Sequence, residues 1–210
     1  MKLALVGHGA LGRQIEGMIT EATPAGETVY FDDHDHRAGI PGAFPFAAHT
    51  GDDFKDFTFY VCLGYKHLGL KKQLVDRLVE LGRDVPYFVH PNAYVHRSVQ
   101  IGAGSMIYAG CTVDRNTRLG RGVLLNNGVV VAHDCSIGDA CWFGPGVTLS
   151  GVVTVAESTF IGSGATVSND LSIGANVVIG LSTAVTRNLG DNVSAIGNPM
   201  RILERPLELV

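Results

Sequence analysis

Apolar residues recur at every sixth position over the larger, C-terminal part of the chain. The series begins at Val89 and ends at Val185, and all seventeen of its members are apolar, most of them β-branched or leucine. No insertion or gap interrupts it. The position four residues later in each hexad is mostly small, and Cys111, Cys135 and Cys141 occupy it. A fixed internal period of this kind indicates stacked repeats.

A six-residue period with large and small inward side chains predicts a short strand followed by a corner. Three such units close a triangular coil, and coils stack at about 4.8 Å, the spacing of neighbouring strands. Glycine often follows the large residue, as at Gly102, Gly120 and Gly138, and we expect it to supply the positive φ of a sharp corner. The sequence therefore predicts a parallel β-helix over residues 89–190, with 191–210 as a C-terminal cap or tail. Its three cysteines are expected to be small buried residues.

Residues 1–88 lack the repeat and alternate between strand and helix patterns. Strands are predicted at 2–6, 28–31 and 57–63, with amphipathic helices after the first and the third. In the second helix, leucines at 70, 74, 78 and 81 form the apolar stripe. This alternation indicates βαβ units on a parallel sheet, and so a small Rossmann-like α/β domain ahead of the β-helix.

A glycine motif opens the first predicted helix. Gly7, Gly9 and Gly12 match GxGxxG, and Asp32 follows Gly12 by twenty residues. A dinucleotide site needs a larger domain than this N-terminal unit, which has fewer than ninety residues. A tight turn for helix packing is a second interpretation. We favour a third, a mononucleotide site with phosphates at the helix N-terminus and Asp32 or Asp33 hydrogen-bonded to the base or ribose.

Lys66 lies just after the third predicted strand, at the sheet edge where ligands bind in such folds. It is a candidate phosphate partner of the nucleotide. An equally good interpretation is a solvated residue at the start of the next helix.

Composition excludes several classes of function. The net charge is −4, 17% of residues are charged, and no cluster of lysine or arginine suggests a nucleic-acid partner. The apolar N-terminal run stops at Gly7, which is short for a signal peptide or a membrane span, so we expect a cytoplasmic protein without a membrane partner. The four cysteines form no CxxC pair, which argues against a zinc or redox motif.

One stretch of the β-helix is more specific than the repeat itself. It runs from Asn126-Asn127 through His133-Asp134 to Ser150-Gly151, and a closing AIGNP follows at residues 195–199. Together with the small α/β half, this resembles the NeuD/PglD group of hexapeptide-repeat sugar acyltransferases. The resemblance implies a left-handed β-helix, a homotrimer with active sites between subunits, and acetyl-CoA as co-substrate. It also implies acylation of UDP-, dTDP- or GDP-linked amino sugars, with O-acetylation of a sugar such as sialic acid as the alternative.

The same resemblance implies roles for individual residues. His133 would be the general base, with Asp134 raising its basicity, and the backbone N–H of Gly151 would stabilise the oxyanion. Asn126 would lie near the acceptor sugar and Asp32 near the nucleobase, while Ser163 and Gly180 would line the CoA arm. The repeat agrees on one point: His133 is the third residue of its hexad, a corner position that faces outward, where an imidazole can accept a proton.

Two positions depart from the resemblance. Relatives often carry a second histidine nine residues after the base, where this chain has Trp142, which offers only an N–H donor. We expect Trp142 to form a wall of the acyl or pantetheine pocket, which leaves a different acyl group open. Relatives also often carry a histidine late in the first glycine loop, where this chain has Leu11, with His8 earlier.

Other functions fit less well. A zinc carbonic anhydrase of this fold needs three clustered histidines. Here His90 and His96 fall on different faces, and His96 and His133 lie about two coils apart, roughly 10 Å at the strand spacing. We therefore expect no metal. Serine acetylation and amino-acid succinylation do not need the nucleotide-type half, and a non-catalytic scaffold leaves the His133-Asp134 pair without a purpose.

Overall fold

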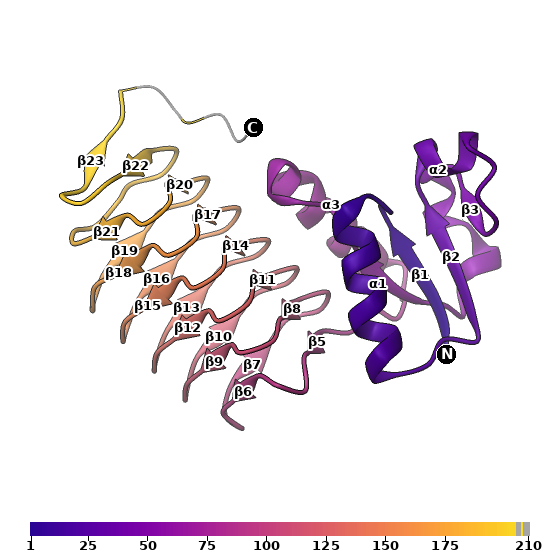
Figure 1. Cartoon of the computed structure of the whole chain (residues 1–210), viewed down its shortest axis with the longest axis horizontal. Helices are drawn as coiled ribbons and strands as arrows, with labels where there is room; N and C mark the ends of the chain where they lie inside the picture. Colours follow the sequence, from indigo (N-terminus) through magenta and orange to yellow (C-terminus); the bar gives the residue numbers. More distant parts are fainter. Residues whose placement is uncertain (205–206, 208–210) are drawn as a thin grey trace.

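The computed structural model describes residues 1–204 and 207 of the chain. An α/β unit packs beside one face of a long parallel β-helix (Figure 1). The predicted architecture, a Rossmann-like half followed by a β-helix of hexapeptide repeats, is confirmed, and its left-handed coiling stays a prediction. Among the described residues, no helix is long and apolar enough to cross a bilayer.

The α/β unit contains a four-stranded parallel sheet in the order β3-β2-β1-β4. The three predicted strands are present, and a short strand β3 and a short helix α2 are additions that the sequence pattern did not indicate. Three 3₁₀ turns are also present: η1 (Phe46–Thr50) and η2 (Asp52–Phe54) lie between β3 and β4, and η3 (Tyr65–His67) precedes α3. The regular elements are β1 (Lys2–Val6), α1 (Ala10–Ala22), β2 (Glu27–Phe31), α2 (Asp33–Arg37), β3 (Ala43–Phe44), β4 (Thr58–Val61) and α3 (Leu68–Glu80).

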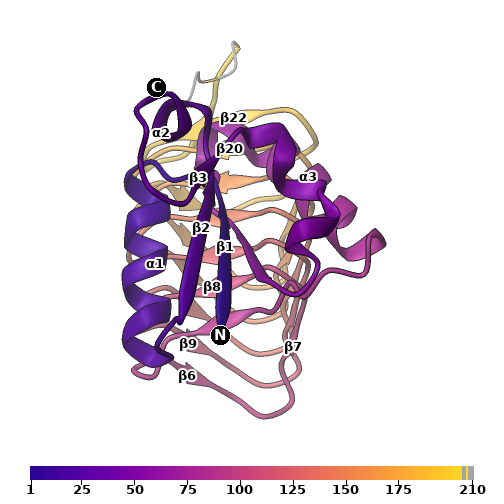
Figure 2. The same ribbon diagram turned by 90° about the vertical axis from the view of Figure 1, so that its right-hand side faces the viewer.

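The side chains of β1 point alternately to the two faces of the sheet and so belong to two different apolar clusters. Leu3 and Leu5 belong to the apolar cluster that includes α1 and the β-helix, whereas Ala4 and Val6 belong to the cluster that includes several phenylalanines and α3. Figure 2 shows α1 and α3 on either side of β1 and β2.

The buried stripe of α3 differs from the predicted leucine stripe. The leucines at 74 and 78 are buried, but those at 70 and 81 are exposed, and the stripe extends instead to Leu68, Lys71 and Val75. The reason is that α3 packs against two partners. Leu74 and Leu78 pack with the sheet, and Leu68 packs with the β-helix.

The β-helix is built from seventeen two-residue strands that coincide with the predicted repeat. The second residue of each strand, from Val89 to Val185, is a member of the apolar series. The strands are β5 (Phe88–Val89), β6 (Tyr94–Val95), β7 (Gln100–Ile101), β8 (Met106–Ile107), β9 (Thr112–Val113), β10 (Arg118–Leu119), β11 (Leu124–Leu125), β12 (Val130–Val131), β13 (Ser136–Ile137), β14 (Trp142–Phe143), β15 (Thr148–Leu149), β16 (Thr154–Val155), β17 (Phe160–Ile161), β18 (Thr166–Val167), β19 (Ser172–Ile173), β20 (Val178–Ile179) and β21 (Ala184–Val185).

From β5 to β18, each strand pairs in parallel with the strand three further along, so one coil takes eighteen residues and the prism has three faces. Face 1 starts with β5 and β8, face 2 with β6 and β9, and face 3 with β7 and β10. In the third coil, residues 126–129 form the 1–2 corner, 132–135 the 2–3 corner and 138–141 the 3–1 corner. Face 1 continues into β22 (Ser194–Ile196), which pairs antiparallel with β23 (Arg201–Ile202).

The left-handed backbone of each corner lies two residues later than predicted. From Gly104 to Ser182, every sixth residue has positive φ. Gly102 does not: a Cβ added there would lie 2.5 Å from the carbonyl carbon of Gly120, its counterpart in the next coil. The prediction that these glycines supply positive φ is therefore wrong. They are small because consecutive coils approach closely at that position.

The outward residues of face 1 from β5 to β17 are apolar and pack against the α/β unit. Tyr65 of η3 packs on Trp142 and Phe160, with ring centroids 5.7 and 5.2 Å apart, and the Lys71 ammonium lies 5.8 Å from the Trp142 ring centre. At the 3–1 corner, Arg121 forms an ion pair with Asp76 of α3. The α/β unit therefore covers face 1, and the 2–3 corner lies on the opposite edge of the prism.

Lys71 places a buried amine in this interface. Its residue is only 1% exposed, and within the described part of the chain no carboxylate forms an ion pair with it. Burial lowers the pKa of Lys71 to about 8, while the neighbouring Cys62 and Cys141 thiols act weakly in the other direction. The charged form is thus disfavoured in the folded protein.

We expect Lys71→Met to stabilise the protein at neutral pH. In the unfolded chain Lys71 keeps its proton up to about pH 10.5, but in the folded protein it keeps it only up to about pH 8. Because the unfolded state binds more protons between these values, the contribution of Lys71 to the free energy of unfolding rises with pH in this range. The advantage of Lys71→Met should shrink by about 3 kcal/mol across that range. Urea denaturation of both proteins at several pH values checks this, since the contributions of titrating groups that do not interact with Lys71 cancel in the difference. A pH-independent difference would contradict it.

Candidate functional site

The predicted catalytic pair, His133 and Asp134, lies at the 2–3 corner. His133 Nδ1 is 2.8 Å from Asp134 Oδ2, and the two side chains are 44% and 43% exposed. The outward orientation predicted for His133 is therefore observed. A carboxylate only accepts hydrogen bonds, so a neutral His133 carries its proton on Nδ1 and leaves Nε2 free to accept one.

Gly151 lies directly over His133 in the next coil. The register of β12 and β15 sets this stacking. A Cβ at position 151 would be 2.7 Å from His133 Nε2, so only glycine leaves room for the imidazole. The backbone N–H of Gly151 donates to Asn169 Oδ1 at 3.2 Å, and an oxyanion bound there has to replace this acceptor.

Asn116 joins the pair from the preceding coil, and the sequence reasoning missed it. Its Nδ2 donates to Asp134 Oδ1 at 3.0 Å. The hydrogen bond from Asn116, followed by that from His133, lowers the pKa of Asp134 below its usual value. Asp134 therefore stays ionised as the acceptor for His133 Nδ1.

The two cysteines of the third coil, Cys135 at this corner and Cys141 at the 3–1 corner, point inward, as predicted. Cys135 is buried, and its Sγ lies 3.3 Å from the Ser150 carbonyl oxygen. Burial raises the pKa of Cys135, and it raises that of Cys141 to about 12. Both thiols are therefore poor nucleophiles at neutral pH.

A second group of predicted residues lies at the 1–2 corner, along the other edge of face 2. Asn126 follows β11, Ser163 follows β17 and Gly180 follows β20. Asn126 Oδ1 accepts a hydrogen bond from the Asn127 N–H at 2.8 Å. At Gly180 a Cβ would lie 2.7 Å from Ile196 Cγ2, so close packing against β22 accounts for this glycine.

Trp142, predicted to wall the acyl pocket, belongs to face 1. It is 7% exposed and packs under Tyr65 and Lys71 of the same chain. Its indole ring therefore forms part of the interface between the α/β unit and the β-helix.

The glycine loop of the α/β unit combines a left-handed turn with close packing. Gly7 has φ of +91°, and a Cβ at Gly12 would lie 2.5 Å from the Gly7 carbonyl oxygen. The packing interpretation therefore explains Gly12. Gly9 immediately precedes α1 and has open space around it, so its backbone is accessible to a ligand. Lys66, in η3, is exposed at the same sheet edge.

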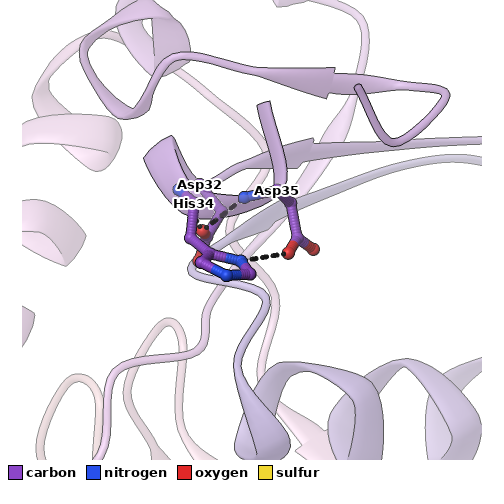
Figure 3. Close-up of side chains that lie close together, drawn as sticks. All are labelled: Asp32, His34 and Asp35. Atoms are coloured by element: carbon purple, nitrogen blue, oxygen red, sulfur yellow. Dashed lines mark hydrogen bonds and ion pairs between the residues drawn. The ribbon is translucent and has the colours of Figure 1, made fainter. Parts of the chain in front are cut away.

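The two predicted nucleotide-side aspartates make hydrogen bonds within the fold. Asp32 Oδ1 accepts from the backbone N–H groups of His34 (2.9 Å) and Asp35 (3.2 Å), which caps α2 (Figure 3). Its Oδ2 accepts from the His8 N–H at 2.9 Å, which ties the glycine loop to α2. Burial alone would raise the pKa of Asp32, but these three backbone donors lower it overall. Asp33 Oδ1 similarly accepts from the Phe46 N–H.

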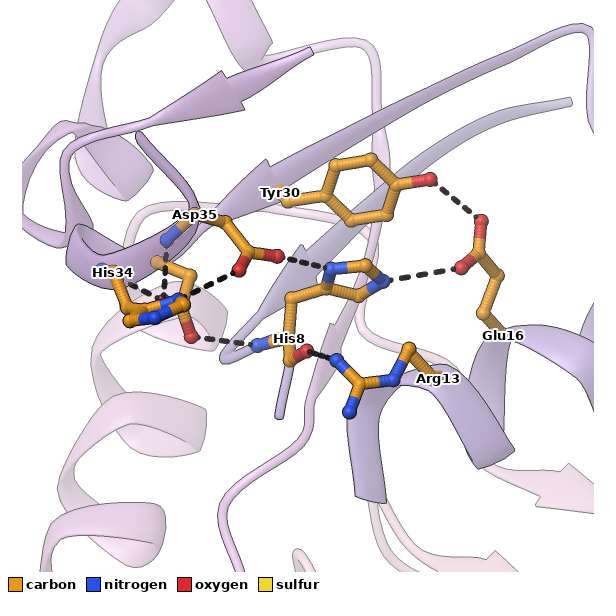
Figure 4. Close-up of polar contacts among 7 residues, drawn as sticks. His8, Arg13, Glu16, Tyr30, His34 and Asp35 are labelled. Atoms are coloured by element: carbon orange, nitrogen blue, oxygen red, sulfur yellow. Dashed lines mark hydrogen bonds and ion pairs between the residues drawn. The ribbon is translucent and has the colours of Figure 1, made fainter. Parts of the chain in front are cut away.

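His8 is the centre of a polar cluster that the sequence did not reveal. Its Nδ1 lies 2.6 Å from Asp35 Oδ2 and its Nε2 lies 3.3 Å from Glu16 Oε2 (Figure 4). The Tyr30 ring stacks on the imidazole, and its hydroxyl donates to Glu16 at 2.8 Å. Arg13 donates to the His8 carbonyl. This cluster holds the glycine loop in one conformation.

Ligand atoms of Asp32, His34 and Asp35 also lie within 4.8 Å of one another, a spacing that a metal ion could use. The capping bonds and the His34 to Asp35 contact at 3.1 Å already account for this arrangement.

The predicted site residues thus fall into separate groups on one chain. His133, Asp134 and Gly151 share the 2–3 corner, and Asn126, Ser163 and Gly180 share the 1–2 corner. The glycine loop, Asp32, Asp33 and Lys66 lie in the α/β unit, which covers face 1. One chain alone does not bring these groups together.

Comparisons with known proteins identify the family and the fold that this chain resembles. Residues 116–151, which include His133 and Gly151, match the family model described as bacterial transferase hexapeptide (six repeats). Among curated proteins, none matches the chain. The structure is similar to the acetyltransferase domain of PglB from Neisseria gonorrhoeae in complex with acetyl coenzyme A, with 27% identity and a TM-score of 0.87 over 96% of this chain and 98% of that one.

Two further solved structures are similar over their whole length. PerB from Caulobacter crescentus, in complex with CoA and GDP-perosamine, has 28% identity and a TM-score of 0.87 over 97% of each chain. WeeI from Acinetobacter baumannii has 22% identity and a TM-score of 0.84 over 97% of this chain and 100% of that one, which supports the fold alone. The comparisons confirm the resemblance to the hexapeptide-repeat sugar acyltransferases and the predicted enzyme class, an acyltransferase.

We expect Asp32→Ala to destabilise the protein by about 1 kcal/mol, the usual cost of losing a helix N-cap. Asparagine also caps helices well, so Asp32→Asn should retain part of the stability. Because the pKa of Asp32 is lowered in the folded state, its contribution is present above about pH 4 and is lost as the pH falls further.

Urea denaturation at pH 7 and pH 3 measures both effects. Asp56→Ala is the matched control, since Asp56 is exposed and makes no hydrogen bond in the part of the chain that the structure describes. Equal losses for Asp32→Ala and Asp56→Ala would show that the cap does not stabilise the fold.

Proposed function

We propose that this chain transfers the acetyl group of acetyl-CoA to the amino group of a UDP-, dTDP- or GDP-linked amino sugar. The observation that carries the proposal is the His133–Asp134 pair beneath Gly151, at an exposed corner of the β-helix. The structural likeness to proteins solved with acetyl-CoA, or with CoA and GDP-perosamine, supports both substrates. We also propose the cytoplasm as the location of the reaction, since the apolar N-terminal run that stops at Gly7 is short for a signal peptide.

The geometry supports direct transfer without an acyl-enzyme. His133 Nε2, free to accept a proton, takes one from the attacking amine as its nitrogen bonds to the thioester carbon. The resulting oxyanion accepts a hydrogen bond from the Gly151 N–H, in place of Asn169. When the carbon–sulfur bond breaks, the protonated imidazole returns a proton to the CoA thiolate. The buried thiol of Cys135 takes no part.

The nucleotide half of the acceptor is proposed to bind the α/β unit. The open backbone at Gly9 and the N-terminus of α1 favour the phosphates. Lys66 is exposed at the same edge and can pair with them. Asp32 acts there mainly by holding the loop, since its carboxylate already accepts three backbone hydrogen bonds.

The separation of the site residues supports a homotrimer. Face 2 has the His133 group along one edge and the Asn126 group along the other, and none of its outward side chains is charged: Tyr94, Thr112, Val130, Thr148, Thr166 and Ala184. In a ring of identical subunits with face 2 toward the axis, the 2–3 corner of one chain meets the 1–2 corner of its neighbour. Each site then takes His133 from one subunit and the acceptor-binding groups from the next.

The first test compares His133→Ala with Cys135→Ala at saturating substrates, using release of free CoA thiol as the readout. His133→Ala should lower kcat by about 10²–10⁴-fold, because general-base assistance is lost while no core residue is removed. Cys135→Ala should keep substantial activity and lose stability instead, since the thiol fills the prism. A folded but inactive Cys135→Ala, or near wild-type turnover by His133→Ala, would refute the mechanism.

The second test mixes two inactive variants in one oligomer. Gly9→Asp puts a negative charge at the proposed phosphate site, where a side chain has open space, so it should fold and bind the acceptor poorly. When Gly9→Asp and His133→Ala subunits assemble together at random, about a quarter of the shared sites carry both native halves. Activity should therefore recover to about that fraction.

Light scattering supplies the control for assembly, since a fully active monomer would exclude shared sites. An absence of recovery in verified mixed trimers would show that each site is formed within one chain.

A further inference from the structure

We propose that Asn116 is a positioning residue for the general base, which it controls by orienting the Asp134 carboxylate. The inference rests on the proposed function, because it assigns a role to a side chain that acts through the His133–Asp134 pair. Asn116 lies eighteen residues before Asp134, and so directly beneath it at the 2–3 corner.

The Asp134 carboxylate is held at both oxygens. Oδ1 accepts from Asn116 Nδ2 at 3.0 Å, and Oδ2 faces His133 Nδ1 at 2.8 Å. Rotation of the carboxylate breaks both contacts. With Asn116 in place, the oxygen that faces Nδ1 is defined, and this in turn keeps Nε2 directed toward the acceptor side of Gly151.

Asn116 is itself anchored from the coil below. Its backbone N–H donates to Ser98 Oγ at 2.8 Å, and Ser98 Oγ lies 2.9 Å from His96 Nδ1. Hydrogen-bonded polar residues thus follow one another over three coils at the 2–3 corner, from Ser98 through Asn116 and Asp134 to His133. Asn116 is therefore held by a hydrogen bond from the coil below as well as by its bond to Asp134.

The charges around Asp134 favour the ionised form that this arrangement needs. Asn116 donates to it without carrying a charge, and His133 and Arg115 act in the same direction. Loss of Asn116 leaves Asp134 with one partner instead of two. The carboxylate can then turn toward solvent, and the imidazole loses the contact that sets its tautomer.

Asn116 also has a place in the backbone conformation of its corner, and this role differs from positioning the Asp134 carboxylate. Asn116 has φ of 58°, in the left-handed region that asparagine tolerates well, and glycine occupies the same position at several other corners. Asn176 provides a matched control. It has φ of 55° at the 3–1 corner, and its Nδ2 donates to Asn192 Oδ1 at 3.3 Å, away from His133.

The experiment compares Asn116→Gly with Asn176→Gly, because glycine suits the left-handed backbone and removes only the side-chain hydrogen bond. Asn116→Gly should lower kcat roughly tenfold, a part of the effect of a general base, with both KM values and the melting temperature nearly unchanged. Asn176→Gly should keep wild-type kcat. In an Asp134→Gly background, adding Asn116→Gly should change kcat no further, because the residue acts through Asp134.

Wild-type kcat for Asn116→Gly, while His133→Ala is inactive, would overturn the positioning role and leave the proposed function intact. An equal loss of kcat with and without Asp134 would also overturn it, since the effect would then not pass through the carboxylate. Full activity of His133→Ala would instead overturn the proposed function, and this inference with it.

Discussion

The backbone hydrogen bonds between consecutive coils are the interaction on which the rest of this structure depends. They join each strand to the strand three further along, as from the Met106 N–H to the Val123 carbonyl and from the Trp142 N–H to the Thr159 carbonyl. Since no insertion interrupts the repeat, each residue from the second coil to Val185 lies over its counterpart eighteen positions earlier. The chemistry at the 2–3 corner is a direct product of this register, because it stacks Asn116, Asp134 and the His133–Gly151 pair in adjoining coils.

The features that the sequence predicted well are those that a local period determines. The inward series from Val89 to Val185 coincides with the strands, and the inward cysteines and outward His133 follow from their places in the hexad. Likewise β1, β2, β4, α1 and α3 of the α/β unit have clear local patterns, whereas the short elements α2 and β3 do not. Each of these depends on only a few neighbouring residues, so one sequence is enough to identify it.

The features that were missed depend on contacts between residues far apart in the chain. Gly102 was assigned to a turn, but it is small because Gly120 of the next coil lies against it. Asn116 gave no local signal, although a search of the repeat at eighteen residues would have paired it with Asp134. The use of Asp32 as a cap has a sequence signal, an aspartate just before a helix, but the His8 N–H that binds its second oxygen comes from a distant loop.

The stacking of the coils also determines where the molecule can open. The backbone of each coil pairs with the coil before it and the coil after it, and face 1 also packs against the α/β unit, so the protection of a coil depends on both contacts. In the first coil, Val89, Val95 and Ile101 are only partly buried, whereas the series is fully buried from Ile107 onward. The first coil therefore exposes less buried apolar surface when it unfolds than an inner coil does, and we expect its amide protons to exchange faster. His133 lies in the third coil, well inside the stack, so the reactive corner belongs to a part of the molecule that seldom unfolds on its own.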